Sequence, residues 1–155
     1  MAGFRSSAWD PINIVSQILT IQCVLYFGLV IWIFLMDFIA ASDRSLDQLF
    51  AYSALSFQQF NGRLIMGAFV LNSLTGAVGL WFIVQRTKLC LDFTASAHFF
   101  HLLICWCYNQ AFPNTLSWWL TNLICVIIMT VLGEFMCMRT ELKAIPLGMG
   151  PKVDL

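Results

Sequence analysis

The chain has 155 residues, of which 60% are hydrophobic and 10% charged; eight acidic side chains balance eight basic ones, and the mean hydropathy is +0.82. A water-soluble domain of this size would alternate apolar and polar faces throughout, so this composition excludes that class and predicts an integral membrane protein. Several uncharged runs approach or exceed the roughly 20 residues that cross about 30 Å of hydrocarbon. We therefore expect an all-α fold, a single domain built as a four-helix transmembrane bundle.

The first span is predicted from about residue 12 to residue 36, after a short amino terminus of residues 1–11. It is longer than the roughly 7–15 apolar residues of a signal peptide, so we expect it to be retained. The one sizeable loop follows, residues 40–62. Within this loop Ser45 and Gln48 have the spacing of a capping box, which predicts a short helix at the membrane interface.

A second span is predicted from about residue 64 to residue 84. One of its faces carries small and polar residues suited to close helix contact, namely Ala68, Asn72, Thr75 and Gly79. A tight turn with Arg86 and Lys88 comes next. Because short connections favour antiparallel packing of consecutive helices, we expect the second and third spans to be neighbours.

The third span, about residues 89–108, is the least apolar of the four. Polar residues recur along it at steps of four, three, four and three: Thr94, His98, His101, Cys105 and Tyr108. At 100° per residue these side chains form one stripe of a helix, here called the polar stripe. A stripe that faced lipid would leave imidazoles unpaired in hydrocarbon, so we expect it to face the other helices.

Three roles for the histidines remain open from the residues. Hydrogen bonds to neighbouring helices would make His98 and His101 part of the packing, which is the favoured interpretation. With Cys105, and with Asn122 or Cys125 from the fourth span, they could instead form a metal or haem site. A direct part in partner binding is the third. All six cysteines lie in or beside apolar runs, so free thiols are expected, and we expect no resident metal or cofactor.

The fourth span is predicted over about residues 116–138, followed by a tail of residues 139–155. An aromatic belt at one interface is expected from Trp106, Tyr108, Phe112, Trp118 and Trp119. With four spans, both termini share a side with the Arg86/Lys88 turn. That side collects Arg5, Arg86, Lys88, Arg139, Lys143 and Lys152, against Arg44 and Arg63 opposite. The positive-inside rule therefore predicts that both termini are cytosolic.

Two carboxylates, Asp92 and Glu134, belong near the cytosolic ends of their spans. An acid within the membrane costs a few kcal/mol unless it is paired or reaches water. They are therefore expected either to form boundary salt bridges with nearby cations or to line a polar mouth open to the cytosol. The candidate partner-binding residues are Asp92, Glu134, Arg139, Arg86 and Lys88.

Nothing in the sequence combines into catalytic machinery. No Ser/His/Asp arrangement, phosphate-binding glycine loop or nucleic-acid-binding basic patch is present. We therefore expect no enzyme, no catalytic residue and no nucleic acid partner. A small bundle in the lipid bilayer could carry something across, hold other membrane proteins or display a cytosolic docking surface, and the residues alone do not choose among these.

Several motifs along the chain resemble one family. They are Asp10-Pro11 with Ile14 and Gln17, Ser45-Leu46-Asp47-Gln48, Gly62-Arg63, the run from Leu91 to His101, Phe112-Pro113, Trp118-Trp119 and the run from Gly133 to Lys143. In this order, and over nearly the whole chain, they resemble integral membrane protein S, linking to the trans Golgi network, the Sys-one homologues. Residues 51–61 and the final tail do not carry the resemblance.

The resemblance implies a Golgi membrane protein with four spans and cytosolic termini. It further implies a receptor that recruits an ARF-related small GTPase with an acetylated amino terminus to the trans-Golgi, in support of vesicle trafficking and protein targeting. The assignment of the docking site to Asp92, Glu134 and Arg139, with Arg86 and Lys88, comes from their position and not from the family. The alternative is a small transporter, or a metal- or haem-binding tetraspan protein, that uses His98 and His101.

Overall fold

The structure is a computed structural model, and it describes residues 10–43 and 45–144. The expectations for residues 1–9, for Arg44 and for the tail beyond residue 144 lie outside these ranges. Seven helical segments follow one another: α1 (Pro11–Ala40), α2 (Asp47–Phe50), the 3₁₀ turn η1 (Tyr52–Ala54), α3 (Phe60–Ile83), the 3₁₀ turn η2 (Thr87–Leu89), α4 (Cys90–Asn109) and α5 (Leu116–Ala144). The described residues contain no strand.

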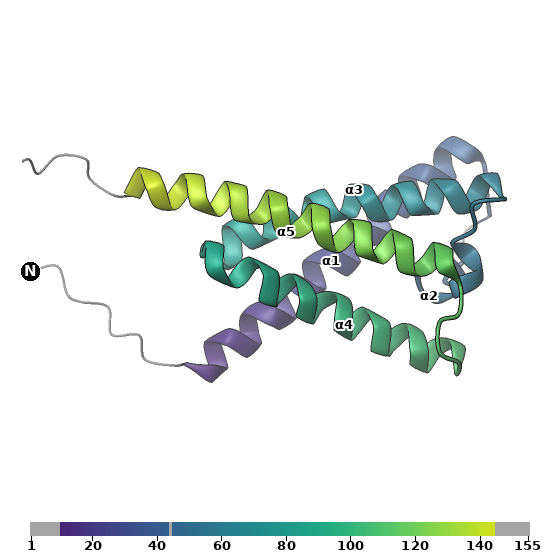
Figure 1. Cartoon of the computed structure of the whole chain (residues 1–155). Helices are drawn as coiled ribbons and strands as arrows, with labels where there is room; N and C mark the ends of the chain where they lie inside the picture. The colour runs from purple at the N-terminus through teal and green to yellow at the C-terminus, as the bar shows by residue number, and fades with distance from the viewer. Residues whose placement is uncertain (1–9, 44, 145–155) are drawn as a thin grey trace, which may run out of the picture.

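Four of these helices are long and apolar enough to cross a membrane, which confirms the predicted class. They form a bundle with two distinct ends (Figure 1). The start of α1, the turn η2 and the end of α5 lie at one end, here called the terminal end. The segments α2 and η1 and the connection from α4 to α5 lie at the other, here called the loop end.

Helix α1 is the longest, and it crosses the bundle obliquely (Figure 1). The Asp10 side chain accepts a hydrogen bond from the Asn13 backbone N–H at 3.4 Å, and Pro11 occupies the first turn, where its missing N–H costs nothing. Its 30 residues reach about 45 Å at 1.5 Å per residue. Because that length exceeds the hydrocarbon thickness, a tilt is the expected adjustment.

The spatial order of the long helices differs from their order in the chain. Helix α3 packs most closely on α1 and α5, and α4 packs on α5 and on α1, so α3 and α4 are diagonal to each other. The expectation that the second and third spans are neighbours was therefore wrong. The six residues 84–89 between them, which include the turn η2, carry the chain across the bundle.

The α1–α3 contact uses the small and polar face predicted for the second span. The indole N–H of Trp32 donates to Thr75 Oγ1 at 3.0 Å, and the Asn72 amide donates to the Leu25 carbonyl at 3.0 Å. Gly28 lets α1 approach this face, because a Cβ there would lie 2.5 Å from Asn72 Oδ1. Small residues at the contact thus bring two polar faces within hydrogen-bonding distance.

Segments α2 and η1 close the loop end. The Tyr108 hydroxyl donates to Asp47 Oδ1 at 2.5 Å, the Asn109 amide donates to the Phe50 carbonyl at 2.7 Å, and the Ser117 hydroxyl donates to the carbonyl of Leu55. Side chains from the last turn of α4 and the first turn of α5 therefore fix the loop between α1 and α3.

The predicted short helix in this loop is present as α2, but its capping differs from the expectation. The Ser45 hydroxyl accepts from the Asp47 backbone N–H at 3.1 Å. Gln48 does not reach back to Ser45. Its amide donates instead to Asp37 Oδ1 at 3.2 Å and to the Asp43 carbonyl at 3.1 Å. Bonding to the end of α1 ties the loop to the bundle, which a local capping box would not do.

The aromatic residues near the loop end divide into two groups. Trp106, Phe112 and Trp119 are exposed, and the Phe112 ring contacts Trp106 and Trp119, with centroids 5.6 Å and 6.0 Å away. Trp118 is only 3% exposed and packs edge-on against Tyr52 at 5.5 Å. The expectation that Trp118 belongs to the interfacial belt was wrong, because its ring fills the core below η1.

Candidate functional site

The polar stripe of α4 runs along the inside of the bundle for most of its length. Thr94, His101 and Cys105 are buried, and both ring nitrogens of His98 are shielded from solvent. Tyr108 is 46% exposed and lies at the loop end, where it bonds to Asp47. The structure therefore gathers four members of the stripe inside the bundle and leaves the fifth at its edge.

His101 is held by neighbours from three other helices. Its Nδ1 and the Tyr26 hydroxyl of α1 share a hydrogen bond of 3.1 Å, and Cys105 Sγ lies 3.5 Å from Nε2. Its ring stacks on Trp118 of α5 at 6.4 Å and meets Phe69 of α3 at 5.8 Å. Both nitrogens thus have protein neighbours, and aromatic rings from three helices surround the imidazole, an arrangement that fits a packing role.

His98 is placed differently. Both of its ring nitrogens are buried, and neither has a hydrogen-bond partner among the described residues. The Asn122 amide lies close to the ring, but no hydrogen bond between the two side chains has good geometry. The Asn122 amide donates instead to the Trp118 carbonyl one turn earlier in α5, at 2.9 Å. His98 therefore faces the interior with its hydrogen-bonding capacity unused by the protein.

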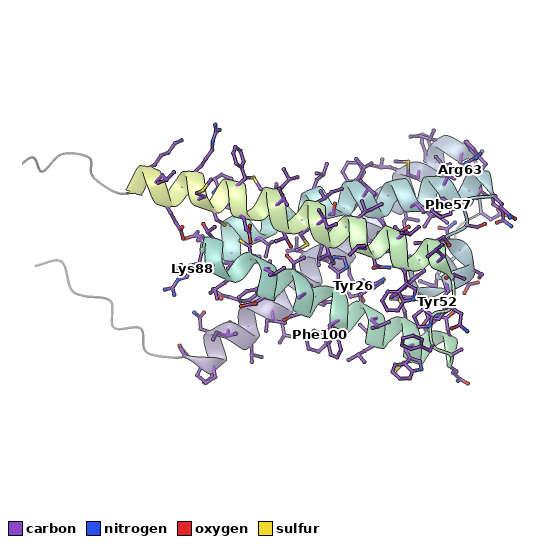
Figure 2. All side chains as sticks on the ribbon, in the orientation of Figure 1. Tyr26, Tyr52, Phe57, Arg63, Lys88 and Phe100 are labelled. Carbon is purple, nitrogen blue, oxygen red and sulfur yellow. The ribbon has the colours of Figure 1, made fainter. Side chains whose placement is uncertain are left out.

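These side chains belong to a polar layer between two apolar clusters. The layer comprises Gln22, Tyr26, Asn72, His98, His101 and Asn122. Along α1 it falls between Ile21 of one cluster and Leu29 of the other, and along α3 it falls between Leu80 and Phe69. Tyr26, which lies between Lys88 and Tyr52 along the bundle in Figure 2, marks its level. The middle of the bundle is thus more polar than either end of its core.

The part of the layer that the structure describes shows no cluster of metal-ligating side chains. Within residues 10–43 and 45–144, no three His, Cys, Asp or Glu side chains lie close enough together to hold an ion. Cys125, which was a possible further ligand, is buried in the apolar cluster near the loop end. Cys107 is exposed while Cys105 is buried, so the two thiols of this pair face different surroundings.

The five candidate partner-binding residues all lie at the terminal end. Asp92 is exposed in the first turn of α4, Glu134 is half-buried on α5, and Arg139, Arg86 and Lys88 are exposed. The Arg139 guanidinium lies 4.8 Å from the centre of the Phe135 ring on the same helix. Among the described residues no two of the five form an ion pair.

The contacts that shape this end involve residues that the sequence did not single out. Glu141 accepts two hydrogen bonds from Thr87, and the Trp81 indole donates to Thr140 Oγ1 at 2.7 Å. The thiols of Cys90 and Cys137 lie 3.7 Å apart beneath them. Glu141 is close to Arg139 in the chain, but the spacing of residues along α5 does not indicate that the Glu141 side chain points toward η2.

A buried polar layer inside four membrane-crossing helices, with a charged end and short connections, defines a polytopic membrane protein of the four-helix type. The comparisons with known proteins give the particular family. A family model described as "Integral membrane protein S linking to the trans Golgi network" matches residues 4–147, and the chain belongs to this family. Its members are membrane proteins of the Golgi and trans-Golgi network that serve membrane trafficking, and they are not a known enzyme family.

Three curated relatives show how far the similarity extends. A Protein SYS1 homolog of Nematostella vectensis is 53% identical over 149 residues, which cover 96% of this chain and 94% of the relative. A homolog of Dictyostelium discoideum is 42% identical over 97% of this chain and 65% of its own. Protein SYS1 of Saccharomyces cerevisiae is 26% identical over 90% of this chain and 69% of its own. No solved structure matches.

Proposed function

We propose that this protein is a receptor that recruits an ARF-related small GTPase, with an acetylated amino terminus, to the trans-Golgi membrane. Membership of a trans-Golgi membrane family is the observation that carries this proposal. The docking surface is the terminal end, which faces the cytosol in this proposal. Its recognition residues are Asp92, Glu134 and Arg139, with Arg86 and Lys88 beside them.

The charge distribution supports this choice of surface. The described cations of the terminal end are Arg86, Lys88, Arg139 and Lys143, whereas the loop end has Arg63. Lys88 and Arg63 mark these two ends in Figure 2. Because cytosolic segments carry the excess of Lys and Arg, this asymmetry favours a cytosolic terminal end, where a soluble GTPase can reach it.

The charges at this end are also available to a partner. No ion pair joins any two of the five residues among the parts of the chain that the structure describes, so a partner need not first break one. Both signs are present within the last turns of α5 and the first turn of α4. Charged groups at the rim of an interface contribute specificity and association rate more than affinity, which suits a reversible recruitment step.

At the terminal end, helix α5 reaches beyond the turn η2 and the start of α4 (Figure 1). The Glu141–Thr87 contact fixes its last turns against η2, and Leu142 is 59% exposed. An acetylated amino terminus has no charge, so an amphipathic first helix of the GTPase can lie in the interface next to this apolar side chain. Such a helix binds membranes weakly and without organelle preference. In this proposal the terminal end of the receptor provides the specificity for the trans-Golgi membrane.

The test is the localisation of the GTPase in cells that express Asp92→Ala or Glu134→Ala. Both variants should disperse the GTPase while this protein stays in the Golgi. Asp43→Ala is the matched control, because it removes an exposed carboxylate at the loop end. Unchanged GTPase localisation in both test variants would refute the site. Pull-down from mild detergent with acetylated and unacetylated GTPase then shows whether contact with the receptor is direct.

A further inference from the structure

A small, partly open cavity lies between the four long helices, within the polar layer. All four long helices contribute to its wall. Its polar lining consists of Gln22 and Tyr26 from α1, Asn72 from α3, His98 and His101 from α4, and Asn122 from α5. The rest of the wall is apolar. The cavity therefore brings six polar side chains from all four long helices together, away from both ends of the molecule.

Several of these groups have hydrogen-bonding atoms that the described residues leave without a partner. They are Gln22 Oε1, Asn72 Oδ1 and both ring nitrogens of His98, and all four atoms are buried. One ring nitrogen of a neutral histidine is a donor and the other an acceptor, whereas the amide oxygens only accept. A ligand that donates and accepts hydrogen bonds can satisfy all of them, and an apolar ligand cannot.

The size of the cavity limits what fits. It offers about 40 Å³ to the centres of water-sized spheres. A single water needs about 10–15 Å³ by this measure, so the space corresponds to roughly three water molecules. A whole sugar or a whole lipid chain does not fit in this space. The lining contains no carboxylate and, among the described residues, no three metal-ligating side chains meet, so a divalent ion is not favoured.

We propose that this cavity is a water-binding site in which roughly three water molecules connect His98 with Gln22 and Asn72. Polar cavities with two to four available partners hold ordered water, whereas apolar cavities of similar size stay dry. The water connects α4 to α1 and also to α3, the helix diagonally opposite α4 in the bundle. It thereby completes the hydrogen bonding of the layer, independently of the GTPase proposal.

The chain is well suited to a direct test, because His98 and His101 are its only histidines. Selective ¹⁵N-histidine labelling of the full-length protein in lipid bilayers gives signals from these two rings alone. In water-edited solid-state NMR, polarisation that starts on water protons should reach the His98 nitrogens. His101 provides the comparison, since Tyr26 and Cys105 already occupy its nitrogens, and its transfer should be slower.

Variants at two alanines of α4 locate the water. Ala97 is 2% exposed and lines the cavity, so Ala97→Leu fills the space that the water occupies. Ala95 is exposed on the same helix, and Ala95→Leu is the matched control. The water-derived signal of His98 should be lost in Ala97→Leu and kept in Ala95→Leu.

Two results would overturn the proposal. One is the absence of transfer from water to His98 in the unmodified protein. The other is an unchanged His98 signal in a folded Ala97→Leu protein, which would place the water elsewhere. If the leucine does not allow folding, Ala97→Val adds less volume at the same site and is judged by the same signal.

Discussion

Glu141 on α5 accepts two hydrogen bonds from Thr87, one from the backbone N–H to Oε1 at 3.2 Å and one from the hydroxyl to Oε2 at 2.8 Å. Thr87 is the first residue of η2, and its neighbours Arg86 and Lys88 belong to the proposed docking surface. A single carboxylate therefore fixes the turn between α3 and α4 against α5. The geometry of the terminal end depends on this contact.

Replacing Glu141 with alanine should loosen the turn. Hydrogen bonds to a charged group contribute about 1.5–3 kcal/mol each, but both groups are solvent-exposed here, so we expect a loss of only about 1 kcal/mol. The sharper readout is hydrogen exchange at the Thr87 amide, which should accelerate in Glu141→Ala and less in Glu141→Gln, which keeps one acceptor. Glu134→Ala is the control. Equal exchange in all three variants would show that the contact does not hold η2.

At the loop end, two tyrosines allow a matched comparison. The Tyr108 hydroxyl donates to Asp47, whereas the Tyr52 hydroxyl is buried and has no partner among the described residues. The nearby Asn109 amide already donates to the carbonyls of Phe50 and Cys105. Tyr108→Phe should therefore lower the unfolding temperature, and Tyr52→Phe should change it little or not at all.

The measurement is thermal unfolding of the two variants in the same mild detergent. Proteolysis of the loop around α2 adds a local readout, because release of Asp47 should expose this segment in Tyr108→Phe alone. A larger loss in Tyr52→Phe than in Tyr108→Phe would contradict this account of the loop end.

The sequence predicted the four spans because length and apolarity alone decide whether a helix can cross hydrocarbon. It did not predict which spans are neighbours. A short connection limits the distance between two helix ends, but residues 84–89 are long enough to cross the bundle diagonally. Which helices become neighbours is decided by side-chain contacts such as Thr87–Glu141. This contact joins residues 54 positions apart, so no pattern within one segment of the sequence indicates it.

For the polar stripe, the spacing of His98 and His101 shows that both lie near one face of α4. It does not show what that face meets. Tyr26, the partner of His101, lies 75 positions away in a run of apolar residues. Trp118 was predicted to lie at the lipid interface because tryptophan is common there, but its ring is buried against Tyr52 and His101. Tertiary packing overrode the average preference.

The orientation of the bundle gives a further prediction. A protease-sensitive tag placed after Leu155 should be digested in sealed Golgi vesicles, because the excess of Lys and Arg at the terminal end predicts a cytosolic carboxyl terminus. A tag inserted after Ser53, in η1 at the loop end, should be protected until the membrane is permeabilised. The reverse pattern would place the proposed docking surface in the lumen and exclude its use by a cytosolic GTPase.

Two glycines test how closely the helices must approach. A Cβ on Gly28 of α1 would lie 2.5 Å from Asn72 Oδ1 and 3.2 Å from Thr75 Cγ2, whereas a Cβ on Gly67 of α3 would meet nothing within 4 Å. Asn72 has little freedom to move away, because it is buried and its amide donates to the Leu25 carbonyl. Gly28→Ala should therefore force α1 and α3 apart and cost about 1–3 kcal/mol.

Gly67→Ala is the matched control, and its effect should have the opposite sign. Alanine is favoured over glycine inside a helix by up to about 1 kcal/mol, and here the added methyl group has open space. Thermal unfolding of both variants in the same detergent measures the difference. If Gly28→Ala were as stable as Gly67→Ala, the close contact at Asn72 would not be needed, and the wall that α1 and α3 give the central cavity would be looser than described.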